Sequence, residues 1–290
     1  MLGPTDLVLC SGTLQQTPLR EKITAARDSG FQAISLWVED VEQAGAEGIT
    51  PRDIRQRLAD AGLEVAELDP LLCWLGSGTL GAGAASGADS MLGRDEDEFF
   101  AIADTIGGRL INCAHPFTGP VDLDAAAEAF AGVCDRAARH GLDAGIEFLP
   151  WTGIPDAVTA AEIVQRAGRP NGGVVFDTWH HFRGTNDDDA LRKLPGALIK
   201  AVQLNSAPHT PTAEPMIESM HSRRLPDEGD IEVANLVRIL DQIGSLAPIG
   251  VEVFSDELRK IPPSEAAERC ARSARSVIGA ARSPGTKRRE

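Results

Sequence analysis

The chain has no tyrosine, few aromatic residues of any kind, few cysteines and a shortage of positive charge. Its 28 basic residues against 43 acidic ones leave a formal charge of -15, which repels phosphate backbones and anionic membrane surfaces. We therefore expect neither nucleic acid nor membrane as a partner. The five cysteines are odd in number and form no CxxC pair, which indicates reduced thiols in a cytoplasmic protein.

Targeting signals and cofactor-binding turns are also missing from the sequence. No stretch reaches the ~18 apolar residues of a membrane span, and the first ten residues lack the basic and apolar regions of a secretion signal. No GxGxxG turn follows the first strand-like run, in LVLCSGTLQQT, which argues against a dinucleotide-binding doubly wound sheet. A soluble, unexported protein that acts on a small molecule is expected.

Eight short apolar runs alternate with amphipathic helical segments along the chain. The expected strands are residues 6–10, 33–37, 64–68, 109–114, 143–149, 173–178, 201–205 and 249–254. Eight such units in 290 residues predict an α/β fold, a single (β/α)8 TIM barrel. The barrel domain is expected over residues 1–280 and a flexible tail over 281–290.

Local signals mark some of the helix starts and loops. Thr50, Asp122 and Asp230 each precede an amphipathic run and are expected to be N-cap residues. The Gly/Ala/Ser-rich stretch at 76–88 follows the third strand, where it is either a flexible lid or a disordered insertion.

Polar side chains end four neighbouring strands. The apolar runs of strands five to eight finish on Glu147, Asp177, Gln203 and Glu252. The carboxyl ends of barrel strands meet at one face, so these groups can converge, and a divalent cation would relieve their repulsion and desolvation. Oxygen donors favour Mn²⁺ or Mg²⁺ over zinc, with Co²⁺ as a possible substitute. The alternative is that each acid caps a helix or pairs with an arginine at the rim.

Tryptophans follow the same strand ends. Trp37, Trp151 and Trp179 come at or just beyond the ends of strands two, five and six, and Trp74 follows strand three. Together they would wall a pocket and stack on the apolar face of a polar ring. Taken singly, each is equally well explained as an ordinary packing residue.

Histidines and one arginine complete the set of candidate site residues. His180 lies beside Asp177 and is a candidate catalytic group, the alternative being an ordinary core histidine. His115 after strand four and His209 in the loop at 206–230 are candidate substrate contacts. Arg223 in the same loop is a candidate clamp for an oxyanion or carboxylate, unless it forms a surface ion pair.

Several motifs resemble the xylose isomerase-like TIM-barrel superfamily, often labelled sugar phosphate isomerase/epimerase. They are EFLPW, FDTWHH, KAVQLNSAP, RRLPDEGDI and GVEVFSDEL, in family order and spread over nearly the whole chain. In the sugar 3-epimerases of this group, Glu, Asp, His and Glu hold a metal. By motif, the resemblance implies metal ligation by Glu147, Asp177 and Glu252, and substrate contacts by His180 and Arg223.

Two places depart from the epimerase pattern. Gln203 stands where the family usually has a histidine on strand seven, and Asp227 and Glu228 replace a glycine-led turn. The glutamine, the RRLP loop and the VFSDEL ending resemble bacterial 3-dehydroshikimate dehydratases of the same superfamily.

The residues and the resemblance together predict a divalent-metal-dependent isomerase or epimerase of a polyhydroxy carbonyl compound. Glu147 and Glu252 would move the proton next to the carbonyl through a stabilised enediolate. The alternative is a lyase that dehydrates a cyclic keto-polyol, of 3-dehydroshikimate or inosose dehydratase type. An endonuclease IV-like repair enzyme, which would need a multi-histidine zinc site and a basic groove, and a non-catalytic barrel are less favoured. A homo-oligomer is compatible with the sequence.

Overall fold

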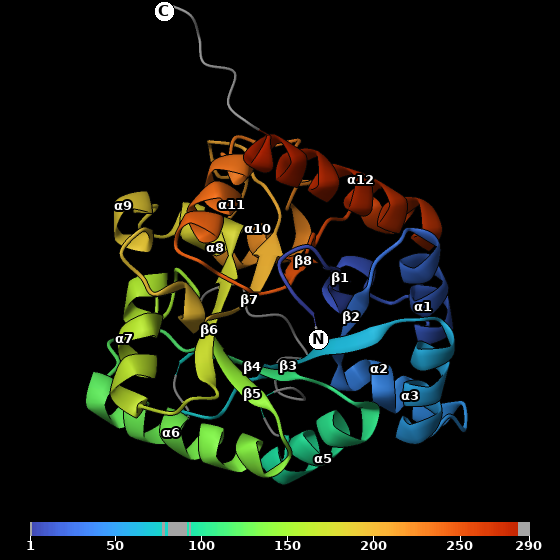
Figure 1. Ribbon diagram of the computed structural model, residues 1–290, viewed down its shortest axis with the longest axis horizontal. Helices are drawn as coiled ribbons and strands as arrows, with labels where there is room; N and C mark the ends of the chain where they lie inside the picture. Colours follow the sequence, from blue (N-terminus) through green and yellow to red (C-terminus); the bar gives the residue numbers. More distant parts are fainter. Residues whose placement is uncertain (1, 77–78, 81–91, 93, 284–290) are drawn as a thin grey trace, which may run out of the picture.

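The computed structural model describes residues 2–76, 79–80, 92 and 94–283. Its eight parallel strands close into a barrel in chain order, with β8 pairing back to β1 (Figure 1). The strands are β1 (Leu7–Leu9), β2 (Ala33–Trp37), β3 (Glu64–Leu71), β4 (Leu110–Ala114), β5 (Asp143–Glu147), β6 (Gly172–Asp177), β7 (Ile199–Leu204) and β8 (Ile249–Val251). The predicted (β/α)8 barrel is confirmed.

Helices form a ring around the barrel (Figure 1). The α-helices are α1 (Leu19–Asp28), α2 (Val38–Ala46), α3 (Pro51–Asp60), α5 (Glu96–Ile106), α6 (Leu123–Arg139), α7 (Ala157–Ala167), α8 (Thr178–Arg183), α9 (Asp188–Leu191), α10 (Pro215–His221), α11 (Val233–Gln242) and α12 (Pro263–Arg282). Three 3₁₀ turns are η1 (Ser11–Leu14), η2 (Gly196–Leu198) and η3 (Leu258–Lys260). No helix in the described part of the chain is long and apolar enough to span a membrane. The main core lies between the helices and the outer face of the strands.

The helix starts follow the sequence signals in two of three cases. Thr50 and Asp122 cap α3 and α6 by accepting backbone N–H bonds, as predicted. The prediction for Asp230 is wrong, because α11 begins at Val233 and the Asp230 carboxylate instead accepts the N–H of His209 at 2.7 Å. Asp230 thus fastens the long loop that precedes the helix.

Two expected segments fall mainly outside the described residues. Of the expected lid at 76–88, only Gly76 and residues 79–80 are described. Of the expected tail at 281–290, residues 281–283 are described, and the first two of them still belong to α12.

The strand register places the candidate polar residues at one end of the barrel. Asp177 and Gln203 are register partners on β6 and β7. Glu147 is the last residue of β5, and Glu252 directly follows β8. Since all strands are parallel, these four side chains come from the carboxyl ends of four consecutive strands.

Candidate active site

A cluster of buried carboxylates lies at the carboxyl ends of β5 to β8. Glu147 is 8%, Asp177 0% and Glu252 4% exposed, so burial removes most of the water that would otherwise stabilise their charges. One ligand atom from each of Glu147, Asp177 and His180 lies within 4.8 Å of the others. The fold therefore brings two of the three predicted acids, Glu147 and Asp177, together with His180.

Arg223 lies between two of the acids. Its Nη1 donates to Asp177 Oδ2 at 2.8 Å and to Glu252 Oε2 at 3.1 Å. The guanidinium is 4.7 Å from the Phe254 ring centroid and 5.6 Å from that of Trp179, and it is itself 2% exposed. Although burial alone would lower the pKa of Arg223, the neighbouring carboxylates raise it, so this side chain is a permanent positive charge inside the cluster.

Asp177 links the end of β6 to the first turn of α8. Its Oδ1 caps the helix by accepting the N–H of His180 at 2.8 Å, and its Oδ2 accepts from Asn205 Nδ2 at 2.7 Å. Burial would raise the pKa of Asp177, but Arg223, His180 and these hydrogen bonds lower it below its usual value. Asp177 is therefore an ionised member of the cluster over the whole physiological range.

Glu147 and His180 form a second contact in the cluster. His180 Nε2 lies 3.4 Å from Glu147 Oε1, while Glu147 Oε2 accepts from Asn112 Nδ2 at 2.7 Å. The imidazole packs edge-on against Trp151 and Trp179, at centroid distances of 5.6 and 5.3 Å. Its Nδ1 is buried and has no hydrogen-bond partner among the described residues, so it is free to meet a substrate or a cation.

Gln203 and Glu252 form the remaining side of the cluster. Gln203 is 0% exposed, and its Nε2 lies 3.5 Å from Glu252 Oε1, while its Oε1 is buried without a partner in the described part of the chain. Burial raises the pKa of Glu252 well above its usual value, and the charges of Glu147 and Asp177 add to the effect against the opposing charge of Arg223. A carboxyl of this kind holds its proton more tightly than an ordinary glutamate does, which is typical of groups that take part in proton transfer.

The cluster has the composition of a divalent cation site. Three carboxylates against one guanidinium leave an excess of negative charge in a buried place, and the orphaned Oε1 of Gln203 is a further hard oxygen donor. A cation with two positive charges would remove this excess and supply the missing partner. The residues present therefore fit a bound divalent metal.

The other predicted substrate contacts lie at varying distances from the cluster. Trp151 and Trp179 flank His180, and Trp37 reaches the cluster through Phe254, whose ring centroid is 6.0 Å from its own. His115 packs instead against Trp74 and Phe117, and burial lowers its pKa. His209 is exposed at the rim, where its ring lies 6.5 Å from Phe182.

Four polar residues of the barrel interior were not predicted from the sequence. Asn112 and Asn205 donate to Glu147 and Asp177. Glu67 and Asp69 on β3 are 2% and 3% exposed, and Glu67 Oε2 and Asp69 Oδ1 have no partner among the described residues. The run EVAELDPL carries a signal for this pair, because acids two residues apart on a strand project to the same side.

The pKa values of both β3 carboxyls are raised, which disfavours their ionised forms. Burial, followed by the charge of Glu147, raises the pKa of Glu67 to about 8. Burial and four neighbouring acids raise the pKa of Asp69 well above its usual value. Both groups therefore hold their protons more tightly than ordinary carboxyls do, in a crowded acidic interior.

The raised pKa of Glu67 predicts a pH dependence of stability for the metal-free protein. The folded state keeps this proton up to about pH 8, whereas the unfolded state loses it near the usual value, so the free energy of unfolding falls as pH rises between these limits. Glu67→Gln is expected to reduce the slope by as much as about 1.4 kcal/mol per pH unit. Urea unfolding at several pH values in EDTA measures this slope, with the exposed Glu64→Gln as control. Equal slopes in wild type and Glu67→Gln would contradict the assignment.

The fold and the site define a parallel (β/α)8 barrel with a carboxylate-rich centre at the carboxyl ends of its strands. The chain matches the profile of the family described as xylose isomerase-like TIM barrel over residues 23–277, and it belongs to that family.

The sequence relatives of the chain include enzymes of two reaction types, a dehydratase and an isomerase. The 3-dehydroshikimate dehydratase of Pseudomonas aeruginosa is 28% identical over 264 residues, which cover 88% of this chain and 38% of that protein. The inosose isomerase of Bacillus velezensis is 26% identical over 155 residues, 52% of this chain and 54% of that protein. The chain thus spans less than two thirds of the length of these relatives, which are enzymes of the superfamily.

A solved structure shows the same fold. The IOLI protein with a binding zinc atom superposes with a TM-score of 0.82 at 18% identity, covering 97% of this chain and 100% of that one. At this identity the comparison supports the barrel fold alone.

Proposed function

We propose that the protein is a divalent-metal-dependent dehydratase, a lyase that acts on a cyclic keto-polyol of the 3-dehydroshikimate type. The observation that carries this proposal is Gln203, which occupies the strand-seven position beside Asp177 and has a buried Oε1 with no partner among the described residues. The similarity to 3-dehydroshikimate dehydratases over 88% of the chain supports it. This reverses the order of preference reached from sequence, in which an isomerase or epimerase came first.

The isomerase remains the second candidate. It is favoured by the similarity to inosose isomerase, which covers 52% of this chain. Both reactions begin with removal of a proton next to a carbonyl, so the same carboxylates serve either outcome. They differ in what happens next, since a lyase expels a β-hydroxyl and an isomerase returns the proton.

The metal would be held by Glu147, Asp177, Gln203 and Glu252, the four residues from the carboxyl ends of β5 to β8. When bound, such a cation polarises the carbonyl and stabilises the negative charge that develops on its oxygen. Oxygen donors favour Mn²⁺ or Mg²⁺. The zinc atom of the IOLI protein adds a further metal to be tested.

The proton steps are assigned to side chains of known placement. Glu252, which directly follows β8 and accepts from Arg223 Nη1 at 3.1 Å, would take the proton from the carbon next to the carbonyl in its ionised form. The electron pair of that C–H bond forms the C=C bond as the β-hydroxyl departs. His180 lies 3.4 Å from Glu147, so the pair could deliver the proton that converts the leaving hydroxyl into water. Arg223 would hold Glu252 and Asp177 in position and face an anionic substrate group.

A single incubation distinguishes the two reactions. With 3-dehydroshikimate and Mg²⁺ or Mn²⁺ in D₂O, a lyase produces a conjugated product with new ultraviolet absorbance and a mass lower by one water. An isomerase acting on inososes or ketoses gives deuterium uptake with no loss of mass. We expect the first result, and turnover of inososes without any dehydration of 3-dehydroshikimate would replace the lyase with the isomerase.

Gln203→His provides a matched variant for the same assay. The family pattern of epimerases has histidine at this position, so the substitution keeps a metal-binding group while changing its chemistry. We expect the variant to retain metal, measured by elemental analysis, but to lose dehydratase turnover by at least about tenfold. Unchanged turnover would remove the main support for a special role of Gln203.

A further inference from the structure

A cavity opens at the opposite end of the barrel from the carboxylate cluster. It has a volume of about 880 Å³, within the range of small-molecule sites. Its lining includes the first residues of four strands, Glu64 of β3, Leu110 of β4, Asp143 of β5 and Ile199 of β7. The cavity is therefore the amino-terminal mouth of the barrel, which the proposed chemistry does not use.

Small inward-facing residues keep this mouth open. Barrel interiors are normally filled by bulky branched side chains. Here Ala66, Ala201 and Gly250 line the cavity. A Cβ atom on Gly250 would lie 2.8 Å from both Cys10 Sγ and Val202 O, so a larger residue does not fit there.

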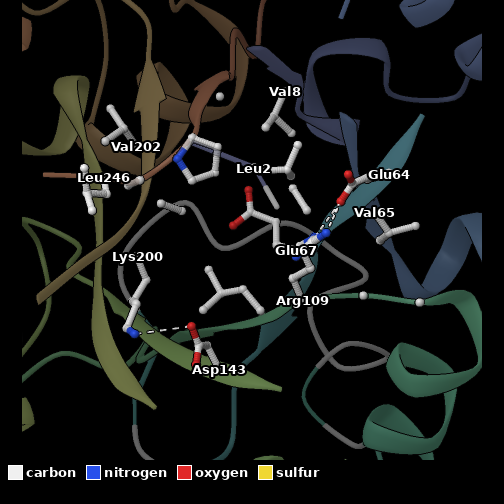
Figure 2. A pocket seen from close by; sticks show the side chains of 18 of the residues that line it. Leu2, Val8, Glu64, Val65, Glu67, Arg109, Asp143, Lys200, Val202 and Leu246 are labelled. Atoms are coloured by element: carbon white, nitrogen blue, oxygen red, sulfur yellow. Dashed lines mark hydrogen bonds and ion pairs between the residues drawn. The ribbon is translucent and has the colours of Figure 1, made fainter. Parts of the chain in front are cut away.

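Glu67 points into this cavity. Figure 2 shows its carboxyl directed into the space enclosed by the lining residues, below Leu2 and Val8 in this view. The residue is only 2% exposed, and its Oε2 has no hydrogen-bond partner in the described part of the chain. A buried carboxyl without a partner is costly, and a ligand that supplied a donor or a positive charge would offset that cost.

The basic side chains that line the cavity form no ion pair with Glu67 among the described residues. Arg109 is paired with Glu64, and Lys200 Nζ lies 3.3 Å from Asp143 Oδ2 (Figure 2). Arg55 makes no ion pair among the described residues and is exposed. The charges at the rim thus balance one another. The buried carboxyl of Glu67 is the group that a bound cation would stabilise. The aliphatic part of the lining includes Leu2, Val8 and Leu110.

We propose that the amino-terminal mouth of the barrel is a second small-molecule site, which binds a primary alkylammonium ion with its charged end on Glu67 and its alkyl chain against the aliphatic walls. No residue that lines this cavity belongs to the carboxylate cluster, so the proposal does not depend on the function proposed for that cluster. An ammonium ion fits because it provides both the positive charge and the hydrogen-bond donors that Glu67 lacks. An alcohol of the same shape provides donors without the charge.

The test uses n-butylamine as the probe and n-butanol as its uncharged match, with the Mg²⁺-loaded protein. At about pH 8.5 the Glu67 carboxyl is largely ionised and the amine is still charged. Methyl-resolved NMR titration follows Val8 and Val202, which line the cavity. We expect saturable shifts at these methyl groups with the amine, and affinity at least about tenfold weaker for the alcohol.

Two variants and one control complete the experiment. Glu67→Gln keeps the shape of the side chain and is expected to weaken amine binding by at least about tenfold, while Ala201→Leu should block the cavity. Glu268→Gln removes an exposed carboxylate of α12 that lies outside the cavity lining and should leave the affinity within about twofold. Absence of saturable binding, equal binding by wild type and Glu67→Gln, or shifts confined to residues elsewhere would each overturn the proposal. Circular dichroism confirms that each variant is folded.

Discussion

Replacing Glu147 by glutamine is expected to lower kcat/KM by about a thousandfold or more while the barrel stays folded. The substitution keeps the size of the side chain but removes the charge that pairs with His180 and would help to hold the metal. Loss of one acid–base group typically costs a factor of about 10² to 10⁴, and weaker metal binding adds to it. Steady-state kinetics on the active substrate, with elemental analysis of the purified variant, measures both effects.

Glu64→Gln is the matched control for this variant. It makes the same chemical change on β3 at the other end of the barrel, where Glu64 pairs with Arg109 on the surface. Its kcat/KM and metal content should equal those of wild type. If Glu147→Gln also kept both, Glu147 would have no part in the chemistry, and a non-catalytic barrel would become the better description.

Replacing Arg223 by methionine is expected to destabilise the metal-free protein by about 3 to 5 kcal/mol. The guanidinium is bonded to two buried carboxylates, so its removal leaves Asp177 and Glu252 as close, uncompensated acids. Methionine retains much of the apolar contact with the rings of Phe254 and Trp179. The predicted loss therefore comes mainly from the charge. Urea unfolding in EDTA measures it.

Addition of Mg²⁺ separates this electrostatic explanation from simple loss of packing. A divalent cation bound by the carboxylates would replace part of the missing positive charge, so Mg²⁺ should stabilise Arg223→Met more than it stabilises wild type. Arg223→Lys, which keeps one positive charge, should fall between the two proteins in EDTA. A deficit that is the same in Mg²⁺ and in EDTA would indicate that Arg223 acts through packing.

The fold was predictable because its signals are local and repeated. The expected strand at 33–37 coincides with β2, since an apolar run there stands between a helix stop and a helix start. The expected end of β3 at residue 68 was too early. Asp69 and Pro70 have the composition of a turn, yet pairing continues as far as Leu71 and Cys113 of β4. A single sequence does not reveal that a neighbouring strand will override such a local preference.

The candidate site was predictable in its carboxylates and less so in their partners. Glu147, Asp177 and Glu252 stand out because charged residues rarely end a buried apolar run. The amide donors Asn112 and Asn205 could not be assigned, because their roles depend on the register of β4 against β5 and of β6 against β7. The position of Arg223 inside the cluster depends on the path of a long loop, which no local pattern determines.

The Asp177 side chain has two roles in the structure, and a substitution that alters one also alters the other. Its carboxylate lies in the acidic cluster and also caps the helix whose third residue is His180. One peptide segment therefore fixes the separation between the proposed metal ligand and the histidine, whatever the surrounding loops do. Exchange of the loop between β7 and α11 would alter which substrates are accepted but leave this rigid pair intact. Divergence of substrate preference within such barrels can thus proceed through loop replacement, with the reactive core inherited as a unit.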